Sequence, residues 1–201
     1  MRKEEMYMYE GVEVKLLAIT PDSQKLLEQA GRLCYDSGDK LGDNPDWLSA
    51  RIKQGHESLI EHASASFLIR ASRALTHELV RHRIASYSQR SQRYVKEKNK
   101  DYITPPEFAG NTQAAEIYHQ AMSAAWDNYL KLLDAGVKAE IARYVLPNAC
   151  STQIICSWNF RELRHIINLR GSASALPEIR QVAQMLCDIM KEQAPAVFGD
   201  L

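Results

Sequence analysis

The stretch STQIICSWNFRELRHIINLRG, residues 151 to 171, joins a strand pattern to a helix pattern. Its first part is rich in β-branched residues, so we predict a strand over 152–158. Asn159 follows as an N-cap residue, and Glu162 stands three positions later, close to a capping box. The helix presents an apolar face made of Leu163, Ile166 and Ile167. It ends at Gly171, a residue type common just past a helix.

The same two periodicities continue on both sides of this stretch. Alternating apolar residues predict strands over 12–19 and 63–70, and residues 87–95 are expected to be extended and polar. Helical spacing with start and stop residues predicts six further helices: from Thr20 as N-cap and Pro21 to about Cys34, from Asn44-Pro45 to Gly55, from Ser72 towards Arg83, over 117–133, over 139–145, and from Pro177 onward. We predict one α+β domain with helices packed on a small mixed or antiparallel sheet.

The chain is neutral overall, with 25 Lys and Arg against 25 Asp and Glu. This balance excludes a polybasic membrane binder, a bulk nucleic-acid coat and an acidic tail. The charge is nevertheless concentrated. The window from Arg81 to Lys100 holds seven basic residues and one acid, so it is net +6 and the rest of the chain is net −6. We therefore predict one discrete positive site for anionic ligands.

The sequence also gives expectations about location and cysteine chemistry. It has no run of roughly 18 apolar residues, and Met1 to Glu10 lacks the apolar core of a secretory signal, so a cytoplasmic location is expected. The four cysteines form no CxxC pair and no zinc spacing. We expect reduced, mostly buried thiols.

Three groups of polar residues could carry chemistry. Arg81-His82-Arg83 and the serines, glutamine and arginines up to Arg93 suit an anion cradle, or else form a solvated basic helix end. Residues 55–62 hold two histidines six apart, which do not share a helix face, so capping roles are expected in place of a metal site. Arg161 and His165 share a helix face behind Asn159, either for anions or as an ordinary basic surface.

Four ordered blocks resemble the flavin-dependent thymidylate synthase family. The first is Arg81-His82-Arg83, then seven residues, then Ser91, which is similar to the RHR-x7-S signature of the family. The others are similar to its GHES…EH segment, its E-x-A-R-x-x-L-P segment and its N-x-R-E-L helix: Gly55 to His62, Glu140 to Pro147, and Asn159 to Arg170. Glu178-Ile179-Arg180 also fits its last helix. The resemblance runs from about Ala30 to Phe198.

This resemblance implies a single catalytic domain, residues 1–201, that methylates dUMP to dTMP. The carbon would come from 5,10-methylenetetrahydrofolate and the electrons from NADPH through FAD. It also implies a homotetramer with shared active sites and no nucleic-acid or membrane partner. The implied FAD contacts are Ser58, Arg81, His82, Arg83, Gln89, Asn159, Phe160, Arg161 and His165. The implied dUMP contacts are Glu78, Leu79, Val80, Arg81, Gln89, Arg90, Ser91, Gln92, Arg93, Arg143 and Arg170. No metal is implied.

Elementary chemistry agrees with these implied roles. Uracil must become electron-rich at C5 to attack a one-carbon electrophile, and a positive charge beside N3 and O4 stabilises the anionic ring. Arg170, which matches the family residue and always carries its charge, is therefore the expected catalytic group. Phosphate suits Arg90, Ser91, Arg93 and Arg143. No cysteine lies in an electropositive motif, so no thiol nucleophile is expected.

The chain departs from the family pattern at three places. Glu78 stands where the family usually has Gln, Ser88 replaces a frequent Asn, and residues 174–177 replace a His-Ala-Gln-type stretch. Two alternatives stay open at this point: a nucleotide-binding or RNA-binding module without catalysis, and a different flavoenzyme on the same scaffold. The low net charge and the scarcity of aromatic residues near the basic window argue against RNA.

Overall fold

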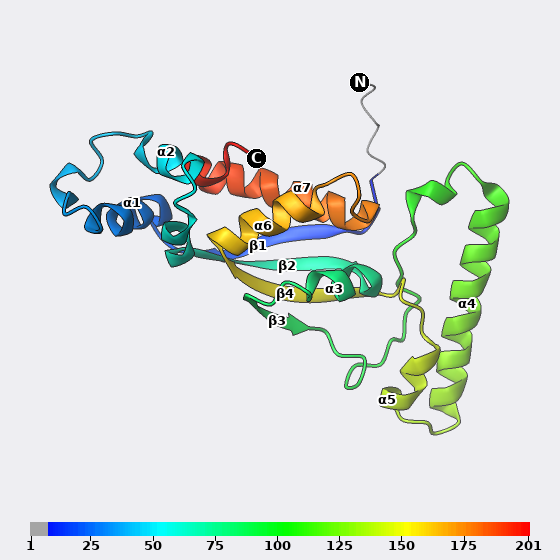
Figure 1. The fold of residues 1–201 in the computed structure, drawn as a ribbon. Coiled ribbons are helices and arrows are strands. Elements are labelled where there is room, and N and C mark those ends of the chain that lie inside the picture. Colours follow the sequence, from blue (N-terminus) through cyan, green and yellow to red (C-terminus); the bar gives the residue numbers. More distant parts are fainter. Residues whose placement is uncertain (1–7) are drawn as a thin grey trace.

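Two nine-residue strands, β2 (Ser64–Ser72) and β4 (Ser151–Asn159), pair antiparallel along their whole length. The computed structural model, which describes residues 8–201, adds β1 (Glu13–Ile19) beside β2 and β3 (Ala85–Gln89) beside β4. The sheet order is β1-β2-β4-β3, and every neighbouring pair is antiparallel (Figure 1). The prediction of an α+β fold on a small mixed or antiparallel sheet is confirmed, and the sheet is antiparallel.

Helices cover this sheet and extend beyond it. In chain order they are α1 (Ser23–Leu33), α2 (Trp47–Lys53), α3 (Arg73–Leu79), α4 (Thr112–Asp134), α5 (Ala139–Ala142), α6 (Phe160–Arg170), α7 (Pro177–Gln193) and α8 (Pro195–Phe198). Figure 1 shows α6 and α7 along one face of the sheet and α4 standing apart from it next to α5. The site described below is built where α3, β3, β4 and α6 meet.

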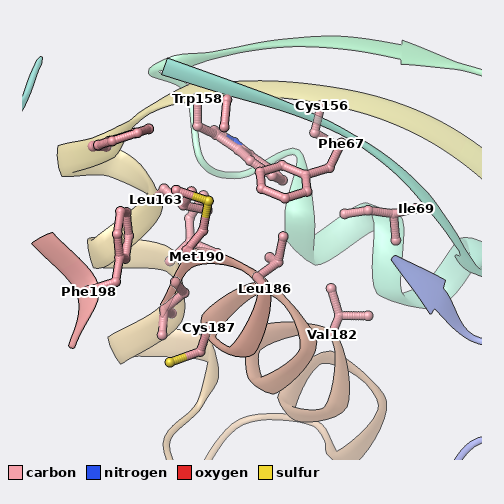
Figure 2. Close-up of a cluster of buried hydrophobic side chains, with 14 of the residues drawn as sticks. Phe67, Ile69, Cys156, Trp158, Leu163, Val182, Leu186, Cys187, Met190 and Phe198 are labelled. Carbon is pink, nitrogen blue, oxygen red and sulfur yellow. The ribbon is translucent and has the colours of Figure 1, made fainter. Parts of the chain in front are cut away.

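The core lies between the sheet and the two helices α6 and α7. Figure 2 shows Trp158 of β4 and Phe67 of β2 facing Leu186 and Met190 of α7. All four side chains are buried, and burying a side chain of this size contributes about 1.5–3 kcal/mol. The indole N–H of Trp158 donates to the Tyr87 hydroxyl at 3.2 Å, so its polar atom keeps a partner. This packing fixes the end of β4, from which α6 starts.

Side-chain caps set the starts of the two helices that carry the site. The Asn159 amide oxygen accepts the backbone N–H of Glu162 at 2.8 Å, and the Ser72 hydroxyl accepts that of Leu75 at 3.0 Å. α6 ends directly before Gly171, and α7 begins at its proline, both as predicted. The Glu162 side chain does not complete the capping box with Asn159, because it bonds to a histidine instead.

The predicted start of α1 is wrong by two residues. Asp22, not Thr20, occupies the N-cap position, and its backbone is left-handed with φ 46°. The Thr20 hydroxyl instead accepts the Ser64 backbone N–H at 2.9 Å and donates to the Ser64 carbonyl at 3.2 Å. Thr20 therefore fastens the end of β1 to β2, and Pro21 lies outside the helix.

Two predictions near the basic window also need correction. The helix that begins after Ser72 ends at Leu79, before the Arg81–Arg83 segment. The Tyr87 hydroxyl lies 2.8 Å from the carbonyl oxygens of both Leu79, at the end of α3, and His82, so its single hydrogen is shared between these two acceptors. The extended segment is 85–89, not 87–95, and a turn follows in which the Ser91 hydroxyl accepts the Arg93 backbone N–H at 3.1 Å.

Several remaining features agree with the sequence in kind but not in extent. The helix predicted over 117–133 spans Thr112–Asp134, since Asn111 caps it earlier. Within residues 8–201, no helix has the length and apolarity to cross a membrane. The segment Met1 to Glu10, in which no secretory signal is expected, is described only from residue 8 onward. Cys150, Cys156 and Cys187 are buried free thiols, and Cys34 is exposed.

Candidate active site

The last residue of α6, Arg170, spreads its guanidinium over two neighbouring elements. Its Nε donates to His82 Nε2 at 3.0 Å. One terminal nitrogen donates to a Glu78 carboxylate oxygen at 2.9 Å, and the other donates to the Glu78 backbone carbonyl at 3.1 Å. α3 and the segment after it thus hold the guanidinium from two sides. The predicted catalytic residue is therefore a partly exposed cation fixed at a helix end.

His82 is the buried centre of this arrangement. Its side chain is 4% exposed, and its Nδ1 lies 3.1 Å from a Glu162 carboxylate oxygen. Burial lowers the pKa of His82 below its ordinary value, and the positive charge of Arg170 lowers it further, although the hydrogen bond to Glu162 opposes the shift. The folded structure therefore favours the neutral imidazole.

A cavity of about 530 Å³ opens beside the start of α6. Asn159, Arg161 and His165, three of the predicted FAD contacts, line it. The Arg161 guanidinium is paired with Glu61 at 2.6 Å and with Glu57 at 3.5 Å. Ser58, a fourth predicted contact, lines a smaller neighbouring cavity of about 170 Å³. The structure thus places these four residues along cavities at one end of the sheet.

The arginines predicted for the dUMP phosphate lie elsewhere, along the turn after β3 and on the α5 side. Arg90 pairs with the buried Glu97 at 2.7 Å. Arg93 Nε donates to the Glu140 carboxylate at 3.0 Å, and Arg143 Nε donates to the Glu140 backbone carbonyl at 3.1 Å. Among residues 8–201, no side-chain hydrogen bond or ion pair joins these arginines to Arg170 or Glu78.

The remaining predicted contacts fall into three groups. Leu79 and Phe160 are wholly buried in the core, so only their backbone atoms can face a ligand. Gln89 donates to the Thr76 hydroxyl at 3.0 Å, which ties β3 to α3. Exposed or half-exposed side chains belong to Val80, Arg81, Arg83 and Ser91, whereas Gln92 is buried with its amide nitrogen unpartnered.

Sequence reasoning missed the partners of two buried carboxylates, Glu162 and Glu178. Glu162 was expected to serve only as a capping residue, yet it bonds to His82, which lies 80 positions away along the chain. Glu178 was expected only as part of a helix start, yet it accepts the Ser72 backbone N–H at 2.7 Å and the Ser72 hydroxyl at 2.6 Å. The only signal was the presence of acidic residues inside otherwise basic or apolar segments.

The donors around the cavity of about 530 Å³ beside α6 suit a flavin dinucleotide. Its volume lies within the usual range for small-molecule sites. Arg164 lines the cavity; its terminal nitrogens pair with the Asp200 carboxylate, and its Nε is buried without a hydrogen-bond partner. Guanidinium and imidazole groups bind phosphate oxygens. No group of metal-ligating side chains occurs among residues 8–201.

Comparison with known proteins agrees with this chemistry. Residues 15–196 match the family model described as "Thymidylate synthase complementing protein". A flavin-dependent thymidylate synthase from Geobacter sulfurreducens is 42% identical over 200 residues, covering 94% of this chain and 86% of the relative. Enzymes of the same name from Clostridium tetani (39% identical; 94% and 86% covered) and Mycobacterium tuberculosis (41% identical; 87% and 78% covered) are also similar.

Proposed function

The chain belongs to the flavin-dependent thymidylate synthase family, and on that premise we propose that the Arg170 site methylates the uracil ring of dUMP. The activity is that of a methyltransferase in dTMP formation, and its cofactor is a flavin. The observation that carries the proposal for this site is the guanidinium of Arg170, held at the end of α6 by His82 and Glu78. A fixed, permanently charged donor is what an anionic uracil ring requires.

FAD is the proposed form of the flavin. The residues that would hold it are those along the two cavities beside α6: Ser58, Asn159, Arg161 and His165. Arg81 and Arg83, whose side chains are exposed, would add charge for its phosphates. When bound, the reduced flavin would supply the hydride that converts the transferred methylene carbon into the methyl group, while the protein positions the reactants. To bind FAD phosphate through Arg161, the chain must exchange the ion pairs with Glu57 and Glu61.

The dUMP phosphate is proposed to bind Arg90, Ser91, Arg93 and Arg143. Two of these arginines already pair with carboxylates, Arg90 with Glu97 and Arg93 with Glu140. These groups make no direct contact with the Arg170 group within one subunit. The homotetramer, whose active sites would combine residues from several subunits, is proposed from the family resemblance. The exposed aromatic side chains of Tyr94 and Tyr144, close in sequence to these arginines, suit such subunit contacts.

The co-substrates are proposed to be 5,10-methylenetetrahydrofolate and NADPH. The methylene carbon forms a bond to uracil C5 and its bond to folate breaks, so tetrahydrofolate leaves. Two electrons that NADPH gives to the flavin reduce this carbon to a methyl group as the C5 proton departs. Burial raises the pKa of the Cys150 thiol to about 11, so this thiol is not an activated nucleophile. A cytoplasmic location stays a prediction.

An omission assay tests the proposed function. Purified protein is incubated with dUMP, FAD, methylenetetrahydrofolate and NADPH, and dTMP is measured with each component withheld in turn. We expect dTMP only in the complete mixture. Formation of dTMP without added folate would overturn the proposed carbon donor, and full activity without NADPH would overturn the proposed reductant.

A further inference from the structure

Glu162 lies at the far end of a chain of side chains that leads to the proposed uracil site. Its carboxylate contacts His82 Nδ1, and His82 Nε2 contacts Arg170 Nε. Glu162 and Arg170 stand at opposite ends of α6, and His82 from another segment connects them. The His82 side chain is 4% exposed and the Glu162 side chain 11% exposed, and Glu162 also lines the cavity of about 530 Å³. Burial of the histidine strengthens its hydrogen bonds to both partners.

The position of the histidine proton follows from the chemistry of the arginine. Arg170 Nε carries a hydrogen and has no lone pair to offer, so His82 Nε2 must be the acceptor. The single proton of the neutral ring then sits on Nδ1, where it is donated to the Glu162 carboxylate at 3.1 Å. The alternative tautomer would place two N–H groups against each other at Arg170.

We propose that Glu162 is a positioning residue. Its carboxylate accepts a hydrogen bond from Nδ1–H of His82, which leaves Nε2 unprotonated to accept the hydrogen bond from Arg170 Nε. This contact holds the guanidinium in the orientation that faces the uracil. This inference rests on the proposed function, because it concerns the same arginine. Glu162 does not touch the guanidinium itself. It acts through the tautomer and the ring orientation of His82.

The tautomer is measured directly by nitrogen NMR on FAD-bound protein labelled with 15N-histidine, and His82→Gln identifies the His82 signals. In the wild-type protein we expect a proton on Nδ1 and an unprotonated Nε2. Glu162→Gln keeps a carbonyl oxygen for the Nδ1 proton, so it should retain this tautomer. Glu162→Ala removes the acceptor and should shift the population towards Nε2–H. An unchanged tautomer in Glu162→Ala overturns the proposal.

Turnover gives the second readout. We expect Glu162→Ala to lower kcat by about 10- to 100-fold, the loss typical of removing a hydrogen-bond partner that orients a histidine in a metal site. Glu162→Gln should restore kcat to within about threefold of wild type, because a neutral hydrogen bond is only somewhat weaker than a charged one. The matched control is Glu28→Ala, whose carboxylate is equally buried, with 13% side-chain exposure against 11% for Glu162, and pairs with Arg32. A kcat in Glu162→Ala equal to that of Glu28→Ala overturns the positioning role.

The pH profile separates positioning from general stability. The charged and titratable groups that face His82 are Glu162, His165 and Arg170, with Glu78 behind the arginine. Since the Glu162 carboxylate favours protonated His82, Glu162→Gln should move the acidic limb of the kcat profile to lower pH. An unmoved limb contradicts the proposal. If wild-type protein makes no dTMP, the proposed function fails, while the NMR result still decides the Glu162–His82–Arg170 linkage.

Discussion

Arg170 Nε and His82 Nε2 lie 3.0 Å apart, and in this pair the histidine is the acceptor. The contact joins the C-terminal end of α6 to the segment between α3 and β3, which are far apart in sequence. It also ties a permanent positive charge to a neutral ring. The orientation of the Arg170 guanidinium therefore depends on which ring nitrogen of His82 carries the proton, as well as on packing.

Removing the guanidinium should abolish turnover. In Arg170→Ala we expect kcat to fall by at least about 100-fold, because the charge that stabilises the anionic uracil is lost. FAD binding should remain, since Arg170 does not line the cavity beside the start of α6. The measurements are dTMP formation and the visible absorption of bound flavin. Turnover at the wild-type rate would contradict the role assigned to Arg170.

Replacing Glu78 with glutamine should improve dUMP binding. The Glu78 carboxylate is 37% exposed and pairs with Arg170 at 2.9 Å, so it competes with an anionic ligand for the guanidinium. An ion pair this exposed contributes up to about 1 kcal/mol, so Glu78→Gln should lower the KM for dUMP by up to about fivefold. The comparison is made at constant ionic strength. A raised KM would indicate that the carboxylate itself binds the nucleotide.

The free energy of unfolding should decline as the pH falls below about 6.5, the ordinary pKa of histidine. Because burial lowers the pKa of His82 in the folded protein, the unfolded chain binds a proton there that the folded protein does not. The loss begins near the unfolded pKa and levels off below the folded pKa; above that window, neither state is protonated. Urea unfolding of wild type and His82→Gln across this range measures it. Parallel curves for the two proteins would contradict the prediction.

The buried hydrogen bonds between Glu178 of α7 and Ser72, the N-cap residue of α3, should be important for stability. Glu178 accepts both the backbone N–H and the hydroxyl of Ser72, and that hydroxyl caps α3. Glu178→Ala leaves a buried N–H without an acceptor and should lower the free energy of unfolding by about 1–3 kcal/mol. Denaturant titration measures the change, with Glu192→Ala on the exposed part of α7 as control. Equal stability of the two variants would contradict this account.

The packing of α1 against α2 can be tested at one glycine. A Cβ on Gly31 would lie 2.5 Å from the Trp47 ring, whereas a Cβ on Gly38 meets nothing within 4 Å. Gly31→Ala should therefore cost about 1–3 kcal/mol through overpacking. Gly38→Ala should leave the free energy of unfolding within about 0.5 kcal/mol of wild type. Thermal unfolding of both variants decides whether Trp47 is fixed in place or can move aside.

Local patterns were enough to predict most of the fold. The β-branched run of β4, the Asn159 cap and Gly171 act over a few residues, so their signals survive in the sequence. The start of α1 was wrong because the Thr20 hydroxyl bonds to a strand 44 residues away. The predicted extent of β3 was wrong because its length is set by its pairing with β4. That pairing ends at Gln89 of β3.

The site was only partly predictable for the same physical reason. Basic residues in a dense window and a helix with Arg161, His165 and Arg170 were visible as donors for anions. Their carboxylate partners were not, because Glu78, Glu97 and Glu162 acquire partners only when distant segments meet. A sequence pattern gives the donor types, whereas the pairing and protonation of the donors depend on the fold.

The proposed FAD-dependent methylation of dUMP is tested by mass-spectrometric detection of dTMP that flavin-free protein makes from dUMP before and after FAD is restored. The other components are 5,10-methylenetetrahydrofolate and NADPH. We predict no dTMP before FAD is added and repeated turnovers afterwards. Equal dTMP formation in both samples, or none in either sample although flavin is bound, would contradict the account.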